Sequence, residues 1–569
     1  MSDSFSRSTR GVLDQRGWGM TMRAWSKASG FDDIDLAKPI VGIAQTWSEF
    51  NHCHIHFKEL AEAVKRGVWQ AGGWPMEFPT ISLGEFHTRP TTMLYRNLMA
   101  MDAEEMIRAQ PMDGVVLLAS CDKNVPALLM GAASANKPAI LMTGGPMLAS
   151  RWNGQVLGAC TDCRRLTEDL RAGRISLDQY REIEDALGRS TGHCMVMGTA
   201  STMASITEAL GMAIPGTAAI PAPDSRRLRL AEAVGRQIVE TIQKNVTPSQ
   251  VLTVKAFDNA IRMLMAIGGS TNAVVHLVAM AGRVGIKLPL ERFDALSRTT
   301  PLIVNLRPSG KFHMEDLFEA GGIPAVLKEL KPLLHLDCIT VTGRTLAEEI
   351  ERAEVRRRDV IFPLSEPIAQ EGGLAVLHGN LCPGGAVIKQ SAASPHLIKH
   401  MGRAVVFRNQ EDLEARIDSP DLDVRSDDVI VLQNIGPKGA PGMPEWGSIA
   451  IPKKLLDQGV RDMVRISDGR MSGTAQGTVV LHVCPESAVG GPLALVRDGD
   501  LIELDVGART LNLLVPDDEL IRRRLEWKKM PPQYQRGYGK LFLDHVLQAD
   551  GGCDFDFLHG DERRDHLGQ

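Results

Sequence analysis

The chain has 569 residues, of which 44% are hydrophobic, so it is long enough to form two or more domains with separate cores. Its 64 basic and 69 acidic residues give a formal charge of −5, a balance that excludes the strongly basic surfaces with which proteins bind nucleic acid or anionic membranes. Nine cysteines, an odd number, and the lack of any run of ~18 apolar residues predict reduced thiols and no membrane-spanning helix.

The N-terminal third alternates short β-branched runs with stretches of helical periodicity, a pattern that predicts βαβ units on a parallel sheet. Residues 1–10 lack the apolar core of a signal peptide. We therefore expect a soluble cytoplasmic protein with a small-molecule substrate, and with neither nucleic acid nor a membrane as partner. Strands are expected at residues 39–44, 78–83, 115–120 and 139–143, and helices at residues 57–68, 92–109 and 125–135.

Several chemically reactive side chains follow the expected ends of these strands. Cys53 comes after the first strand, Glu85 after the second, and Cys121, Asp122 and Lys123 after the third. In open α/β sheets, ligands bind beyond the carboxyl ends of the strands. We therefore expect these residues to share one site.

Three cysteines, Cys53, Cys121 and Cys194, lie in polar turns beside expected helix starts, where the helix dipole lowers the pKa of a thiol. Their wide separation along the chain excludes zinc-finger and ferredoxin spacings. If the fold brings the thiolates together, they fill three of the four ligand positions of an iron–sulfur cluster. The fourth position would be open to substrate, which would make the cluster a Lewis acid. Taken singly, each cysteine could instead fill a hydrophobic core.

Two further patterns suggest other metal chemistry. His52, His54 and His56 alternate, so on a strand they would share one face and could hold zinc with a carboxylate, whereas in a polar loop they would not. Cys160 and Cys163 form a Cys-x-x-Cys pair, but no second pair stands at zinc-finger spacing. A zinc hydrolase and a non-catalytic iron–sulfur sensor are therefore alternative functions.

The type of secondary structure that the sequence predicts changes along the chain. Residues 195–360 are rich in helical segments, and beyond about residue 370 short strands follow one another with glycine and proline turns between them. These strands are expected at residues 373–378, 403–407, 428–432, 501–506 and 510–515. We expect an α/β domain over residues 1–370, with a parallel sheet and a helix-rich part, and a β-rich domain over residues 371–569.

Oxygen ligands and one serine complete the candidate site. Glu85, Asp122 and Glu445 offer carboxylates that suit magnesium, although each taken singly fits a solvated loop acid. Lys123 could pair with Asp122, or carbamylation could turn it into a further oxygen ligand. Ser472 lies in a G-x-x-S-G frame, which is not the nucleophile elbow of hydrolases. It can act as a base only if a nearby cation or the N–H groups of a helix N-terminus stabilise its alkoxide.

Five segments carry a family resemblance that extends over nearly the whole chain. They read Ser-Cys-Asp-Lys at 120–123, Met-Gly-Thr-Ala-Ser-Thr-Met-Ala at 197–204, Ile-Gly-Gly-Ser-Thr-Asn at 267–272, Gly-Pro-Lys-Gly-Ala-Pro-Gly-Met-Pro-Glu at 436–445 and Asp-Gly-Arg-Met-Ser-Gly at 468–473. In these segments the chain resembles the dehydratase family that includes dihydroxyacid dehydratase, 6-phosphogluconate dehydratase and the sugar-acid dehydratases. Val-Asn-Leu-Arg-Pro-Ser-Gly-Lys at 304–311 resembles the arabinonate and xylonate dehydratase branch.

The resemblance implies two metal centres and a base. A 2Fe-2S cluster, with a 4Fe-4S cluster as the alternative, would be bound by three thiolates: Cys53, Cys121 and Cys194. Magnesium would have four ligand residues: Glu85, Asp122, carbamylated Lys123 and Glu445. Ser472 would be the catalytic base. The family also implies a β-barrel-like C-terminal domain, an active site between the two domains, and assembly as a homodimer or homotetramer.

The reaction implied by the resemblance is loss of water from a 2,3-dihydroxy sugar acid to give a 2-oxo-3-deoxy acid, which would make the chain a hydro-lyase. Dihydroxyacid dehydratase of branched-chain amino-acid biosynthesis is the alternative. Four features depart from the family pattern. His54 and Met195 stand where Asn is common, Gln476 stands where sugar-acid members tend to carry an aromatic residue, and the segment around Glu85 reads Gly-Glu-Phe-His-Thr-Arg-Pro. All four lie beside expected ligands, so they bear on the identity of the substrate more than on the type of reaction.

Overall fold

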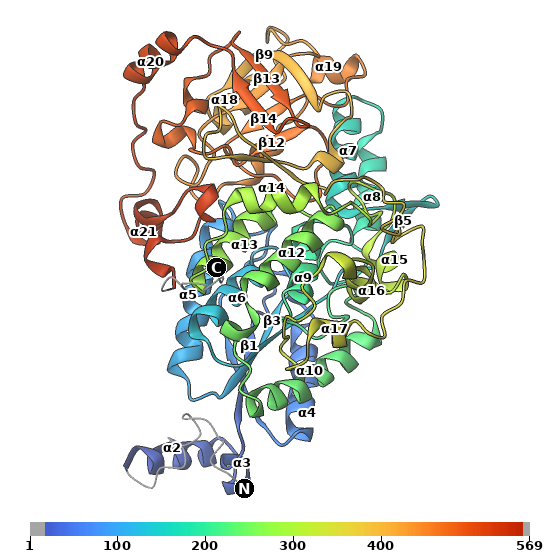
Figure 1. Cartoon of the computed structure of the whole chain (residues 1–569), viewed down its shortest axis with the longest axis vertical. Helices are drawn as coiled ribbons and strands as arrows, with labels where there is room; N and C mark the ends of the chain where they lie inside the picture. Colours follow the sequence, from blue (N-terminus) through green and yellow to red (C-terminus); the bar gives the residue numbers. More distant parts are fainter. Residues whose placement is uncertain (1–16, 561–569) are drawn as a thin grey trace.

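The computed structural model describes residues 17–560, and its two larger β-sheets lie in different parts of the chain (Figure 1). The first sheet is parallel, in the order β2-β1-β3-β4. Its strands are β1 (Ile40–Gln45), β2 (Trp74–Pro79), β3 (Gly114–Ala119) and β4 (Ala139–Thr143). β1, β3 and β4 are buried throughout, as expected for apolar runs covered on both faces. Residues 1–10, on which the expectation of no signal peptide depends, lie outside the described residues.

The predicted parallel sheet is confirmed, but one predicted strand has the wrong bounds. β2 ends at Pro79, so residues 80–83 do not extend the sheet as expected. The physical reason is that side chains hold this segment in a turn. The Ser82 hydroxyl donates to the Thr46 carbonyl at 2.6 Å, and the Ile81 N–H donates to the Asp102 carboxylate at 2.9 Å.

Helices pack around the parallel sheet, and the predicted helices are confirmed as α4 (Phe57–Gln70), α5 (Thr92–Ala109) and α6 (Asn124–Ala135). α4 packs closely against α10 (Ser225–Gln243), because Gly67 and Gly235 face the partner helix where a Cβ would collide with its backbone. The other helices before residue 350 are α2 (Gly17–Ala28), α3 (Asp33–Leu36), α7 (Ala159–Arg171), α8 (Leu177–Leu187), α9 (Thr199–Ala209), α11 (Pro248–Val251), α12 (Val254–Ala266), α13 (Asn272–Arg283), α14 (Leu290–Arg298), α15 (Met314–Glu319), α16 (Gly322–Glu329) and α17 (Leu346–Glu349).

The second large sheet has eight strands and is nearly closed, which confirms the expected β-barrel-like fold. Its order is β14-β13-β9-β10-β11-β12-β8-β7, with β9 to β12 parallel and the outer strands antiparallel. The two ends approach each other at a bridge between His378 and Thr510. The strands are β7 (Ala375–Leu377), β8 (Ala386–Ile388), β9 (Lys399–Phe407), β10 (Val429–Leu432), β11 (Arg465–Ser467), β12 (Val479–Leu481), β13 (Leu501–Asp505) and β14 (Thr510–Leu513).

The C-terminal part of the chain also packs against the N-terminal part, because α21 (Gly537–His545) lies beside α5 (Figure 1). The Tyr538 hydroxyl donates to the Leu94 carbonyl at 2.8 Å, and the buried Arg96 guanidinium donates to the Gly552 and Cys553 carbonyls at 2.9 Å each. A short hairpin of β5 (Ser150–Trp152) and β6 (Gln155–Leu157), with α18 (Gln410–Arg416), α19 (Lys453–Asp457) and α20 (Asp517–Glu526), completes the regular structure. Among the described helices, none is both long enough and apolar enough to cross a membrane.

Candidate active site

One cavity of about 240 Å³, here called the central cavity, gathers most of the residues singled out from the sequence. Seven of them line it: Cys53, Glu85, Cys121, Asp122, Cys194, Glu445 and Ser472. The eighth, Lys123, is fully buried and contacts the carboxylates of this group. Residues from both parts of the chain therefore meet at one place.

The parallel sheet explains how three distant cysteines come together. Cys53 lies in a 3-10 helix, η1 (His52–His54), in the connection that follows β1, and Cys121 lies in the turn between β3 and α6. Cys194 is held beside the residues that follow β4, because the Met147 N–H donates to the His193 carbonyl at 2.8 Å. All three thiols thus lie beyond the carboxyl ends of parallel strands, where ligands bind in this kind of sheet.

The cysteine sulfurs influence one another. The pKa of the Cys53 thiol is raised by a hydrogen bond with Cys121, by burial, and by the neighbouring Cys121 and Cys194 sulfurs. The expectation of a lowered thiol pKa is therefore wrong for Cys53, because crowding and burial outweigh any helix dipole. Thiols arranged in this way become thiolates when a cation binds among them, as in metal sites built from cysteine.

The histidines near Cys53 do not form the alternating zinc site considered from the sequence. They lie in and after η1 rather than on a strand. The His54 Nδ1–H donates to the Thr46 carbonyl at 2.9 Å, and its Nε2 accepts from the Ser120 and Cys121 N–H groups at 3.0 Å each. Both ring nitrogens are therefore engaged, and burial lowers the pKa of His54 to about 3. His54 holds the turn that carries Cys121.

Glu85, Asp122 and Glu445 form the one group of three metal-binding side chains, among residues 17–560, whose ligand atoms all lie within 4.8 Å of one another. The Lys123 Nζ lies 3.3 Å from Glu85, 3.2 Å from Asp122 and 3.7 Å from Glu445. Burial raises the pKa of Asp122 to about 6, with repulsion from Glu85 and Glu445 adding to it and Lys123 opposing it. Three clustered carboxylates of this kind suit a hard cation with oxygen ligands.

One arginine and one asparagine side chain hold Glu445 against the N-terminal part of the chain. Glu445 begins a 3-10 helix, η4 (Glu445–Ser448), and its Oε1 lies 2.5 Å from Arg470 Nη1 and 3.2 Å from Asn272 Nδ2. The other Arg470 nitrogen, Nη2, donates to the Thr91 hydroxyl at 2.9 Å. The next residue, Thr92, donates to the Glu85 carboxylate. Arg470 therefore joins the two carboxylate-bearing segments into one structure.

Ser472 lies in the loop between β11 and β12, in the C-terminal part of the chain. Its Oγ lies 2.8 Å from the Thr474 hydroxyl. The loop is packed tightly against the start of α9, since a Cβ at Gly473 would lie 2.7 Å from the Thr199 nitrogen. Gly198, Thr199 and Ala200, at the N-terminus of α9, also line the central cavity. The partly positive end of a helix therefore faces the space beside the serine.

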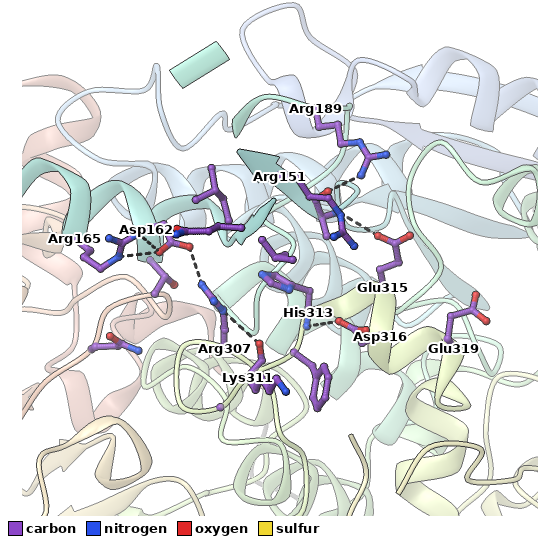
Figure 2. Close-up of a pocket in the computed structure, with 18 residues that line it drawn as sticks. Arg151, Asp162, Arg165, Arg189, Arg307, Lys311, His313, Glu315, Asp316 and Glu319 are labelled. Atoms are coloured by element: carbon purple, nitrogen blue, oxygen red, sulfur yellow. Dashed lines mark hydrogen bonds and ion pairs between the residues drawn. The ribbon is translucent and has the colours of Figure 1, made fainter. Parts of the chain in front are cut away.

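The central cavity opens toward larger ones. An open cavity of about 1110 Å³ shares Cys163 and Thr474 with it. Beyond that lies an outer cavity of about 1080 Å³, in which Figure 2 shows Arg307 reaching toward Asp162 (2.8 Å) and Arg151 and Arg189 on the opposite wall. Arginines and acids alternate around this outer cavity, so it has no strong net charge.

Three of the four departures from the family pattern lie outside the lining of the central cavity. His54 is buried behind Cys121, Met195 is buried beside Met147, and Gln476 lines the two larger cavities with its Nε2 donating to the Pro308 carbonyl at 2.6 Å. The fourth departure, the segment around Glu85, contributes to the lining of the central cavity through Glu85 and Phe86. Sequence reasoning gave no role at this site to several residues that line it: Phe86, Cys163, His193, Thr199 and Thr474.

The site gathers thiols and carboxylates of the kinds that bind metal ions, and comparison with known proteins identifies the family. Dihydroxy-acid/6-phosphogluconate dehydratase N-terminal and C-terminal models match residues 38–349 and 359–553. The chain belongs to this family, as its motifs predicted, and is a hydro-lyase. It is 52% identical to an L-arabinonate dehydratase of Rhizobium leguminosarum bv. trifolii, over 95% of this chain and 93% of that protein. It is 48% identical to a 6-deoxy-6-sulfo-D-gluconate dehydratase of Pseudomonas putida, and 42% to a dihydroxy-acid dehydratase of Caldanaerobacter subterraneus, each over at least 93% of both chains.

Proposed function

We propose that the chain removes water from a 2,3-dihydroxy sugar acid and forms a 2-oxo-3-deoxy acid. The observation that carries this proposal is the central cavity, where the three candidate cluster thiols, three carboxylates and Ser472 face a common space. Dehydration needs help at two bonds, because hydroxide is a poor leaving group and the C2 proton is only weakly acidic. The two sets of ligands suit these two tasks.

The side chains present fit both metal centres that the family implies. Four thiols line the cavity, and we propose that Cys53, Cys121 and Cys194, which lie beyond the ends of parallel strands, hold a 2Fe-2S cluster with an open position, whereas Cys163, on α7, is not a ligand. Glu85, Asp122 and Glu445, with carbamylated Lys123, would hold Mg²⁺. When bound, the cluster supplies Lewis acidity toward the C3 hydroxyl and Mg²⁺ supplies positive charge toward the substrate carboxylate and C2 oxygen.

The proposed role of Ser472 is to take the C2 proton. The C2–H electron pair forms the C2–C3 double bond, the C3–O bond breaks, and the hydroxide leaves with its electron pair and takes up a proton from solvent to become water. The resulting enol takes a proton from solvent at C3 and loses its O–H proton, which gives the 2-oxo acid, and Ser472 releases the C2 proton to solvent. Thr474, hydrogen-bonded to the Ser472 hydroxyl, and the start of α9 are placed to stabilise the alkoxide.

Hydroxyl and imidazole groups in the lining of the central cavity favour a sugar acid over a branched apolar one. Thr199, Ser472 and Thr474 offer hydroxyl groups, and His193 is buried with its Nε2 lacking a hydrogen-bond partner among the described residues. A sugar acid carries further hydroxyl groups that can satisfy such side chains, whereas 2,3-dihydroxyisovalerate ends in methyl groups. The greater identity to the sugar-acid relatives supports the same choice.

The test is formation of 2-oxo acid by anaerobically purified protein with Mg²⁺, using pentonates, hexonates and 2,3-dihydroxyisovalerate. We expect kcat/KM for at least one sugar acid to exceed that for dihydroxyisovalerate. Turnover of dihydroxyisovalerate alone would assign the chain to amino-acid biosynthesis. A protein that holds iron and sulfide but turns over none of these acids would instead support the iron–sulfur sensor.

A further inference from the structure

Lys389 is a buried lysine that contacts the loop carrying the proposed base. It directly follows β8, in the eight-stranded sheet, and its side chain is 1% exposed. Its Nζ donates to the carbonyl of Gly473, the residue after Ser472, at 3.3 Å. No step proposed for the dehydration uses this amine.

The charge of Lys389 has no carboxylate to balance it. Among the described residues Lys389 forms no ion pair, and burial lowers its pKa to about 7. Two arginines lie nearby: Arg470, in the loop between β11 and β12 that carries Ser472 (the serine loop), and Arg509, which contacts Gln390. Both are paired with carboxylates, and neither lowers the pKa of Lys389 further. Burying an unpaired ammonium is unfavourable, whereas an apolar side chain of similar volume could fill the same space. Stability therefore does not explain a lysine here.

The serine loop is held between Lys389 and the start of α9. On one side Gly473 packs against the Thr199 nitrogen and the Ser270 side chain, with no room for a Cβ. On the other side its carbonyl accepts from Lys389. A movement of Gly473 would therefore disturb the position of the Ser472 hydroxyl. The lysine is thus placed both to fix the loop and to act on its charge.

We propose that Lys389 is the positioning residue that prepares Ser472 to act as a base, by fixing the loop through Gly473 and by stabilising the serine alkoxide with its positive charge. This inference rests on the proposed function, in which Ser472 removes the C2 proton. A serine hydroxyl is weakly acidic, so its alkoxide needs a nearby cation. Arg470, the other buried cation of the loop, already serves Glu445 and Thr91. In a buried setting the attraction between the ammonium and the alkoxide is weakened little by solvent, so the alkoxide raises the pKa of Lys389 in turn and keeps the amine charged.

Three substitutions separate position from charge. K389M removes both, K389Q keeps a donor for the Gly473 carbonyl without the charge, and K389R keeps a charge. We expect K389M and K389Q to lower kcat by ~100-fold with KM within threefold, and to move the acid limb of the kcat–pH profile to higher pH by at least one unit. K389R should restore at least a tenth of the wild-type kcat. Iron content should match the wild type, and the melting temperature of K389M should be at least that of the wild type.

The matched control is K399M, because Lys399 begins β9 of the same sheet but is exposed and paired with Asp505 at 3.0 Å. It should leave kcat and its pH profile unchanged. Wild-type kcat and pH dependence in K389M would overturn the inference. K389Q tests the charge alone if K389M does not fold, and a wild-type profile in K389Q would refute the electrostatic role.

A second readout does not depend on turnover. Phenylmethylsulfonyl fluoride reacts with serine alkoxides, so the rate of Ser472 labelling, followed by peptide mass spectrometry, reports the fraction ionised. We expect labelling to rise with pH at a lower midpoint in the wild type than in K389Q. Equal midpoints, or no Ser472 labelling at any pH, would overturn the inference. A protein with shifted labelling but no sugar-acid turnover would refute the proposed function while leaving the lysine effect intact.

Discussion

Ser472 differs from an ordinary turn serine in what surrounds its hydroxyl. The Thr474 hydroxyl, the start of α9 and the Lys389 amine converge on its loop. We expect S472A to keep the visible absorption of the cluster and to lower kcat by at least ~100-fold, the low end for loss of a general base. The control is S419A, in an exposed turn, which should have wild-type kcat. Near-normal turnover of S472A would remove Ser472 from the mechanism.

His482 gives a residue-scale prediction about acid stability. It is buried, neither ring nitrogen has a hydrogen-bond partner in the described part of the chain, and burial, with a contribution from Arg470, lowers its pKa to about 3. Between pH 6.5 and 3 the unfolded state therefore binds a proton that the folded state does not. Stability present above pH 6.5 is lost as the pH falls, by about 2 kcal/mol at pH 5 from this group.

We therefore expect H482N to lose less stability than the wild type when the pH falls from 7 to 5. Asn suits the position because His482 has a positive φ of 57°. Melting temperatures at the two pH values, with exposed His396 replaced in H396N as the control, measure the difference. Parallel behaviour of H482N and the wild type would show that His482 does not titrate as described.

At the scale of elements, η1 and the β3–α6 turn are joined by His54. Its Nε2 accepts from the Ser120 and Cys121 N–H groups, so the 3-10 helix that carries one cysteine orders the turn that carries another. We expect H54A to purify with less than half the wild-type iron per chain and to lose visible absorption faster in air. H87A is the control, because His87 contacts the Phe50 carbonyl in the same region but not Cys121. Full iron retention in H54A would contradict this role.

The parallel sheet and the ends of three of its strands could be predicted from the sequence, because buried runs such as residues 115–119 leave little choice of structure. The strands β8, β11 and β12 could not, since each has only three residues between glycine-rich turns. The alternating histidines suggested a zinc site on one face of a strand, and this interpretation failed for a related reason. Alternation predicts a strand only where the backbone pairs, and here hydrogen bonds to Thr46 and Cys121 bury His54 in a short helix.

At the scale of the whole molecule, the acidic group exists only when both parts of the chain are in place. Glu85 and Asp122 follow strands of the parallel sheet. Glu445 lies between β10 and β11 of the eight-stranded sheet and is paired with Arg470. The sequence could name these residues singly, but their meeting depends on contacts such as Arg470 with Thr91, far apart in the chain. Assembly as a homodimer or homotetramer stays a prediction, which light scattering would test.

We expect E445Q to raise the Mg²⁺ concentration needed for half-maximal activity by at least ~10-fold while keeping the iron content of the wild type, because only one of the two ligand sets is changed. Removing Mg²⁺ with a chelator should abolish activity and leave the visible absorption. E411Q is the control, since Glu411 is an exposed acid on α18 of the same part of the chain. An unchanged Mg²⁺ requirement in E445Q would exclude Glu445 as a ligand.

The most direct test of the central claim is the fate of the hydrogens when the protein converts a sugar acid in D₂O, followed by ¹H NMR. Ser472 removes the C2 proton, the C3 hydroxyl is lost, and the enol is protonated at C3. These steps predict a 2-oxo-3-deoxy acid with one solvent deuteron at C3 and no hydrogen retained from C2. A product that carries the original C2 hydrogen at C3 and no solvent deuteron would mean that this hydrogen is never released to solvent. That result would contradict release of the C2 proton from Ser472 to solvent and protonation of the enol by solvent.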